Sequence, residues 1–196
     1  MAAELEYGRK HPESRWKMPG RWYRPDLPSG TPLVTILMLD SNRDTLTKEQ
    51  WQAHIRWMDE ELAKPCKTAW TLSFRHHPLF SDGRHGDSTA MQTAWGAILK
   101  KYNVDLYLSG HDHVLQHLQM PGRPTAFVIS GGGGDNTNRP VNGNRGRFVR
   151  ATHGFAALQF GTQSVKVSLH VFERDRTGAI RILNTTPGSG PSKVAG

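Results

Sequence analysis

The chain has 196 residues, which is enough for one domain with a hydrophobic core of its own. Its 25 lysines and arginines outnumber its 17 aspartates and glutamates, and the formal net charge of +8 favours anionic partners such as phosphate esters, nucleic acid or an acidic membrane face. The single cysteine, Cys66, excludes an internal disulfide, and no segment approaches the roughly 18 consecutive apolar residues of a membrane-spanning helix.

Frequent prolines and glycines over residues 1–31 predict a loop-rich lead-in, followed by a domain over 32–184. In the first half of that domain, continuous apolar runs alternate with apolar residues at helical spacing. The predicted elements are, in order, a strand at 33–39, a helix at about 48–63, a strand at 68–74, a helix at 88–102 and a strand at 104–110. Thr47 and Gln50 have the spacing of a capping box ahead of the first helix. This order of elements is typical of a parallel sheet with right-handed crossovers.

After His113 the pattern changes to short strands with no helical stretch between them. These strands are predicted at 114–120, 125–130, 155–160, 164–172 and 179–183. They predict an antiparallel set that meets the parallel strands, so the fold class is α/β. The last residues, 185–196, are rich in glycine, proline and serine and predict a flexible tail.

Histidines gather where the predicted parallel strands end. His76 and His77 follow one strand, His111 and His113 follow the next, and His85 lies in the loop between these strands. In open α/β sheets, ligands bind outside the carboxyl ends of the strands. The sequence therefore places several imidazoles at the edge where a binding site is expected.

The spacing of His111 and His113 adds to this expectation. In extended backbone, residues two apart project to the same side, so both imidazoles can serve one metal ion or a pair of ions. Taken alone, a His-x-His pair in a chain with ten histidines favours a structural or incidental role. The position at the strand ends reverses that preference. His77 is expected to be a supporting or surface group, and His117 to face solvent from an alternating strand.

Several segments resemble the calcineurin-like metallophosphoesterases. "SGHDH" is similar to the Gly-His-x-His motif of that family, "FRHHP" to its His-x-Pro segment, and "FSDGRHGD" to the following loop of the purple, tartrate-resistant acid phosphatases. "RWKMPGRWYRP", "TAFVISGGGG" and "HGFAALQF" extend the resemblance from about Glu4 to Leu183. It implies a β-sandwich in which parallel strands with crossover helices are followed by antiparallel strands.

The resemblance also implies an activity and the residues that carry it. The family hydrolyses phosphomonoesters with a dinuclear site of divalent or trivalent iron, zinc or manganese ions. His76 and His111 match ligands of one ion and His113 matches a ligand of the other. His85 matches a histidine near the substrate phosphate that protonates the leaving group. The chain is therefore expected to be an enzyme, an acid phosphatase acting on a phosphate-ester substrate.

One part of the family pattern is not found. The Asp-x-His, Gly-Asp and Gly-Asn-His motifs, which supply the carboxylates and the asparagine, have no match, so the chain is expected to be the C-terminal half of the domain with the N-terminal half missing. Three imidazoles suffice for a single zinc ion, and a second ion would need ligands from another chain. The alternatives to the dinuclear site of the family are therefore a single ion, or no ion in a chain that is inactive. The exposed sheet edge left by such a loss predicts self-association or a partner chain.

A non-catalytic function is the alternative reading of the basic charge. The chain would then be a phosphate- or nucleic-acid-binding module, with Arg145, Arg147 and Arg150 contacting phosphates. Such a cluster is more often a solvated loop, so nucleic acid is not the expected partner, and a membrane is not expected either. The first residues lack the apolar core of a signal peptide. Full-length relatives are often secreted or periplasmic, and the compartment is left open.

Overall fold

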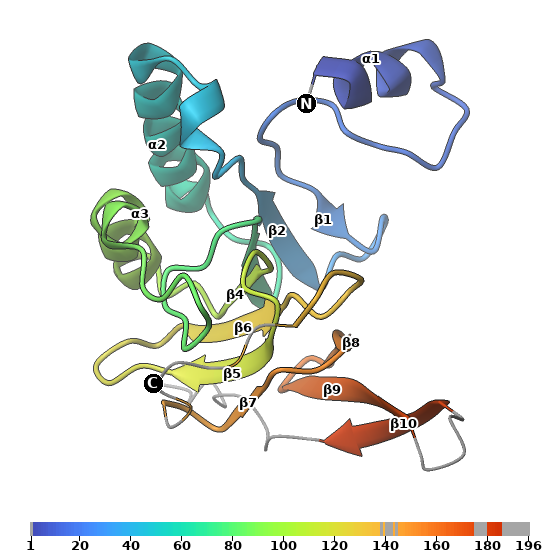
Figure 1. The fold of residues 1–196 in the computed structure, drawn as a ribbon. Coiled ribbons are helices and arrows are strands. Elements are labelled where there is room, and N and C mark those ends of the chain that lie inside the picture. Colours follow the sequence, from blue (N-terminus) through green and yellow to red (C-terminus); the bar gives the residue numbers. More distant parts are fainter. Residues whose placement is uncertain (1, 138, 140–142, 144, 175–179, 186–196) are drawn as a thin grey trace.

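The computed structural model describes residues 2–137, 139, 143, 145–174 and 180–185. The helices Lys48–Ala63 and Thr89–Lys101 lie on one side of a large mixed sheet, and a small antiparallel sheet lies on the other (Figure 1). The elements are α1 (Ala2–Lys10), β1 (Asp26–Leu27), β2 (Val34–Met38), a 3₁₀ turn (Arg43–Thr45), α2 (Lys48–Ala63), β3 (Trp70–Phe74), α3 (Thr89–Lys101), β4 (Leu106–Ser109), β5 (Leu115–Gln119), β6 (Ala126–Ser130), β7 (Phe148–Arg150), β8 (Gly154–Phe160), β9 (Val165–Arg174) and β10 (Ile180–Thr185).

The larger sheet has the strand order β1-β2-β3-β4-β6-β5-β7. Strands β2, β3, β4 and β6 run parallel, with α2 and α3 as the first two crossovers, and β1, β5 and β7 pair antiparallel at its ends. Met38 pairs with Phe74, and Phe74 with Leu108, so the carboxyl ends of three parallel strands lie level. The second sheet is the antiparallel set β10-β9-β8. The predicted α/β class and its two kinds of strand are confirmed.

Each crossover helix is capped at its first turn by the side chain of the residue just before it. The Thr47 hydroxyl accepts a hydrogen bond from the Gln50 N–H at 3.2 Å, and the Gln50 side chain accepts one from the Thr47 N–H at 2.9 Å. This reciprocal pair confirms the predicted capping box. Ser88 caps α3 by accepting from the Met91 N–H.

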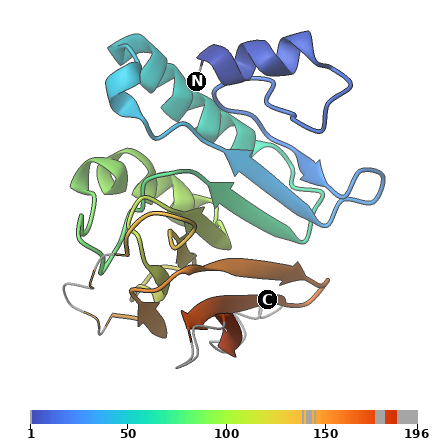
Figure 2. The same cartoon turned by 45° about the vertical axis from the view of Figure 1, so that its right-hand side comes forward.

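The large sheet separates two hydrophobic cores (Figure 2). On the helix side, Trp95 and Leu99 of α3 and Met58 of α2 are fully buried against Leu37 and Tyr107 of the sheet. On the other side, the small sheet packs on strands β3 to β6. Val167, Leu169 and Val171 of the small sheet share one buried cluster with residues of the large sheet. These residues are Trp70, Leu115 and Val128. Alternation along each strand sends neighbouring side chains into different cores.

Two predictions about the elements are corrected. Residues 2–10 form α1 rather than loop, because Glu6 and Lys10 make an i, i+4 ion pair at 2.7 Å and the Trp16 indole donates to the Glu4 carbonyl. The strands predicted at 114–120 and 125–130 belong to the large sheet, where β6 lies parallel to β4. The predicted tail lies, apart from Thr185, outside the described residues.

His117 was expected to face solvent, and this prediction is wrong. Its side chain is fully buried on β5, with antiparallel partners on both sides of the strand. A strand paired at both edges and covered on both faces exposes neither half of an alternating pattern. Among the described helices, none has the length and apolar character needed to cross a bilayer.

His54 of α2 gives the fold a dependence on pH. Its ring is buried, stacks on Trp22 with centroids 4.5 Å apart, and lies edge-on to Trp95. Burial, reinforced by the charge of Arg75, lowers the pKa of His54 to about 4. His117 is likewise buried, and its pKa is also lowered to about 4 by burial. Both imidazoles are therefore neutral in the folded protein at neutral pH.

The free energy of unfolding should fall as the pH falls from about 6.5 to about 4, because over this window the unfolded chain binds protons that the folded chain does not. Each such histidine contributes a slope of up to about 1.4 kcal/mol per pH unit. His54→Phe keeps the stacked ring and removes one titrating group, so the variant should show a shallower slope. Urea unfolding at a series of pH values measures it, and a variant slope equal to that of the wild type would contradict the assignment to His54.

Candidate metal centre

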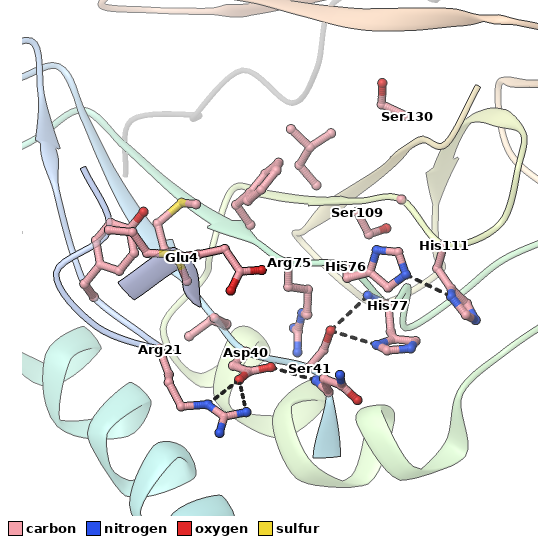
Figure 3. Close-up of a pocket in the computed structure, with 18 of the residues that line it drawn as sticks. Glu4, Arg21, Asp40, Ser41, Arg75, His76, His77, Ser109, His111 and Ser130 are labelled. Atoms are coloured by element: carbon pink, nitrogen blue, oxygen red, sulfur yellow. Dashed lines mark hydrogen bonds and ion pairs between the residues drawn. The ribbon is translucent and has the colours of Figure 1, made fainter. Parts of the chain in front are cut away.

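Two neighbouring strand ends bring predicted histidines together. His76 and His77 follow β3 and His111 follows β4, and the two segments are joined by hydrogen bonds from the Arg75 N–H to the Leu108 carbonyl and from the Gly110 N–H to the His76 carbonyl. The side chains of His76, His77 and His111 converge in Figure 3, and one potential ligand atom from each lies within 4.8 Å of the other two. We call these three residues the histidine cluster.

The distances within the histidine cluster suit a shared ion. Nδ1 of His111 lies 3.1 Å from Nε2 of His76. Two nitrogens bound to one tetrahedral zinc ion at about 2.1 Å are about 3.4 Å apart, so these two atoms need to move little to bind the same ion. The ring centroids of His77 and His111 are 4.3 Å apart. The donor set therefore fits one borderline metal ion such as zinc.

Ser41, just after β2, orients the third imidazole. Its hydroxyl lies 2.8 Å from Nδ1 of His77 and accepts a hydrogen bond from the His77 backbone N–H at 3.0 Å. With Nδ1 engaged in this way, Nε2 is the nitrogen of His77 that remains for a metal ion. Supporting hydrogen bonds of this kind fix ring orientation and strengthen metal binding.

The histidine cluster is neutral at neutral pH. Burial, followed by the neighbouring imidazoles of His77, His85 and His76, lowers the pKa of His111 to about 4. Burial also lowers the pKa of His76 and His77, with a smaller effect of His113 on the former and of His76 on the latter. Lone pairs are thus available for a cation without loss of a proton.

Asp112, between the two histidines of the motif, is completely buried. Its carboxylate accepts hydrogen bonds from the Ser81 hydroxyl and, at 2.9 Å, from the backbone N–H of His85. The loop after β3 is thereby fixed to the turn after β4. His111 itself has φ of 66°, a left-handed conformation that is uncommon outside glycine.

His85 lies at the rim of the histidine cluster, and its role beside a substrate stays a prediction. Its ring centroid is 4.3 Å from that of His111, and the residue is exposed. His113 has a different environment. Its Nδ1 donates a hydrogen bond to the Asn136 carbonyl at 2.8 Å, and it does not belong to the histidine cluster. A metal-binding role for His113 stays a prediction.

Sequence reasoning missed His77 as a possible ligand. The doubled histidine of "HHP" was the available signal, but His77 matches no ligand position of the family motif, and the resemblance therefore predicts only a supporting or surface role for it. The sheet ends at Phe74, so alternation no longer governs the two histidines that follow.

A cavity of about 1020 Å³ opens beside the histidine cluster. Of the described carboxylates, Glu4 and Asp40 line it. Asp40 is buried and forms an ion pair with Arg21 at 2.7 Å, as Figure 3 shows. No described carboxylate belongs to the histidine cluster. The described part of the site therefore offers nitrogen ligands and no bridging oxygen.

Comparison with known proteins gives a consistent result. Residues 5–115 match the family model of calcineurin-like phosphoesterases. Purple acid phosphatase 17 of Arabidopsis thaliana is 35% identical over 102 residues, which are 50% of this chain and 30% of that protein. Tartrate-resistant acid phosphatase type 5 of Homo sapiens is 26% identical over 179 residues, 83% of this chain and 52% of that protein. The chain thus spans about half or less of the length of these relatives.

A solved structure shares the fold. The structure titled "GAP50 the anchor in the inner membrane complex of Plasmodium" superposes with a TM-score of 0.69 and 18% sequence identity, covering 98% of this chain and 62% of that chain. At this identity the likeness shows the fold alone.

Gly131 provides a test of how the site is held. A Cβ at this position would lie 1.9 Å from the Asp112 carbonyl oxygen, whereas a Cβ at Gly133 would meet nothing within 4 Å. Gly131→Ala should therefore lower the free energy of unfolding by about 1–3 kcal/mol, the usual cost of forcing extra atoms into a packed site. Gly133→Ala, in the same glycine run, is the matched control. Equal urea midpoints for the two variants would contradict this account.

Proposed function

Because the chain belongs to the calcineurin-like phosphoesterase family, we propose that it serves in the metal-dependent hydrolysis of phosphate esters, with the histidine cluster as its metal site. The observation that carries the proposal is the convergence of three neutral imidazoles at the carboxyl ends of the parallel strands, beside a large cavity. Acid phosphatases among the similar proteins support a phosphomonoester as the substrate class.

We favour one ion rather than two for the described residues alone. Three protein nitrogens with an open fourth position are the ligand set of mononuclear catalytic zinc sites. A dinuclear iron, zinc or manganese site needs a ligand that bridges the ions, and no described carboxylate lies in the histidine cluster. His113, which the resemblance matches to the second ion, lies outside the histidine cluster, and a second ion would need further ligands besides it.

In this proposal the chain binds the metal and supplies an acid. A bound ion supplies Lewis acidity and lowers the pKa of a water ligand. His76, His77 and His111 hold the ion, and Ser41 keeps the His77 ring in place. His85, held by the hydrogen bond of its N–H to Asp112, donates a proton to the leaving oxygen of the ester.

Nucleic-acid binding is less well supported. Of the arginines considered for phosphate contacts, Arg145 forms ion pairs with Asp82 and Asp87, and Arg150 pairs with Glu173. Arg145 thereby ties the loop after β3 to the start of β7, which is a structural role. Its charge is not available to a phosphate without breaking these pairs.

Zinc titration of the purified chain tests the metal site. Calorimetry should show one ion per chain, and His111→Ala or His77→Ala should weaken binding by at least about tenfold, since each removes one of three ligands. His153→Ala changes an exposed histidine that is not a member of the histidine cluster, and it is the control. His117 is unsuitable as a control because it is buried. Weaker binding in His113→Ala with no change in His77→Ala would contradict the cluster as the site.

Leaving-group dependence tests the role of His85. An ester with a poor leaving group, such as phenyl phosphate, requires a proton from the enzyme, whereas 4-nitrophenolate leaves without one. His85→Ala should therefore lower kcat for phenyl phosphate by about 10²–10⁴ and change kcat for 4-nitrophenyl phosphate much less. The measurement uses metal-loaded protein. Equal losses for both esters would assign His85 a role other than the acid.

A further inference from the structure

The loop that carries His85 is closed at both ends by a single arginine. This loop, residues 81–87, follows β3, and Arg145 approaches it from the segment before β7. The Arg145 guanidinium donates from Nε to the Asp82 carboxylate, and from Nη1 and Nη2 to the two oxygens of Asp87 at 3.0 and 2.7 Å. His85 lies between these two carboxylates in the sequence. We call Arg145, Asp82 and Asp87 the arginine clamp.

The arginine clamp depends on the shape of the guanidinium group. The Arg145 backbone N–H also donates to Asp82 at 3.1 Å, and Nη2 donates to the Ser81 carbonyl at 2.6 Å. Five N–H donors in one plane can serve two carboxylates at once, whereas the ammonium of lysine is a single point charge. In the described part of the chain, the buried carboxylate of Asp82 accepts hydrogen bonds from Arg145 alone.

The residues that follow Arg145 hold it in place. Gly146 has φ of 95°, in the left-handed region that favours glycine, and a Cβ there would lie 2.5 Å from the His117 carbonyl oxygen. The Arg147 N–H donates to that same oxygen at 2.9 Å. The chain beside Arg145 is therefore fixed to β5, and the guanidinium gives the loop a firm support.

The His85 ring takes its direction from the loop. The His85 backbone N–H donates to the buried Asp112, but within the described residues its imidazole makes no hydrogen bond. The ring contacts His111, with centroids 4.3 Å apart. An exposed side chain without hydrogen bonds of its own is oriented by the backbone that bears it, and the arginine clamp holds that backbone on both sides of His85.

The charge of the arginine clamp argues against a direct contact with substrate. The clamp combines one guanidinium with two carboxylates, so its negative charges outnumber its positive charge. Such a group does not attract a phosphate ester. The clamp therefore suits a positioning role, exerted through His85, rather than phosphate binding.

We propose that Arg145, through Asp82 and Asp87, positions the His85 imidazole at the rim of the histidine cluster. The effect on catalysis rests on the proposed function, in which His85 is the acid. A small displacement of a proton donor from the leaving oxygen lowers the rate strongly, because proton transfer needs hydrogen-bond contact. Arg145 is thus a positioning residue and does not itself touch the reacting atoms.

Two variants loosen the arginine clamp. Arg145→Lys keeps the positive charge but presents one ammonium, which cannot bond both carboxylates in this geometry. Asp87→Asn removes the charge from the more exposed end and leaves the buried Asp82 paired, so it remains informative if Arg145→Lys folds poorly. Arg150→Lys is the matched control, because it makes the same change in an arginine whose ion pair with Glu173 is exposed.

The first measurement is the nuclear Overhauser contact between the ring protons of His85 and His111, recorded by NMR on the metal-free chain. The wild type and Arg150→Lys should show this contact, because the two rings touch. Arg145→Lys and Asp87→Asn should lose it. The result does not depend on a bound metal ion or on activity.

The second measurement is the steady-state kinetics of the metal-loaded protein. Arg145→Lys and Asp87→Asn should lower kcat for phenyl phosphate by at least about tenfold, with KM changed by less than about twofold. The kcat for 4-nitrophenyl phosphate should change much less, because its leaving group needs no proton. A merely structural defect would lower both kcat values together.

Three outcomes would overturn the proposal. They are a ring contact that persists in both clamp variants, equal losses of kcat for the two esters, and weaker zinc binding in Arg145→Lys, which would mean that the clamp supports the histidine cluster rather than His85. Loss of the ring contact in a chain whose wild type hydrolyses neither ester would support the arginine clamp and overturn the proposed function.

Discussion

A single buried carboxylate, Asp112, connects the segments that carry the histidines. It accepts hydrogen bonds from Ser81 and from the His85 backbone, and its own carbonyl packs so closely on Gly131 that no larger residue fits there. The ends of β3, β4 and β6 are therefore held at one point. A buried carboxylate persists only when hydrogen bonds replace its water, and each of those bonds here fixes a loop of the site.

Periodicity and strand order were enough to predict the position of the site. Apolar runs and helical spacing predicted three of the four parallel strands, β2, β3 and β4, and both crossover helices, and the sheet edge where His76 and His111 meet follows from them. The relative direction of the His111 and His113 side chains could not be predicted from periodicity and strand order. Extended backbone at this position is not observed, because His111 has φ of 66°, and the buried Asp112 and its hydrogen-bond partners account for that turn. Contacts between segments far apart in the sequence therefore determine the backbone conformation at His111.

The burial of His117 and the presence of α1 have similar causes. A buried histidine and an exposed one look alike in an alternating strand, and only pairing on both sides of β5 distinguishes them. Helix α1 depends on a short-range ion pair and on a contact with Trp16.

Arg75 has a consequence for the conditions under which this site can persist. Its guanidinium is fully buried between the rings of Trp95 and Tyr107, at 3.7 and 4.1 Å from their centroids, directly before His76. The partners of this cation are aromatic rings rather than a carboxylate, and rings bind no protons. Acid therefore cannot break the contact that anchors the end of β3. The end of β3 therefore keeps one of its anchoring contacts even at a pH at which His54, whose ring also meets Trp95, takes up a proton and weakens the fold.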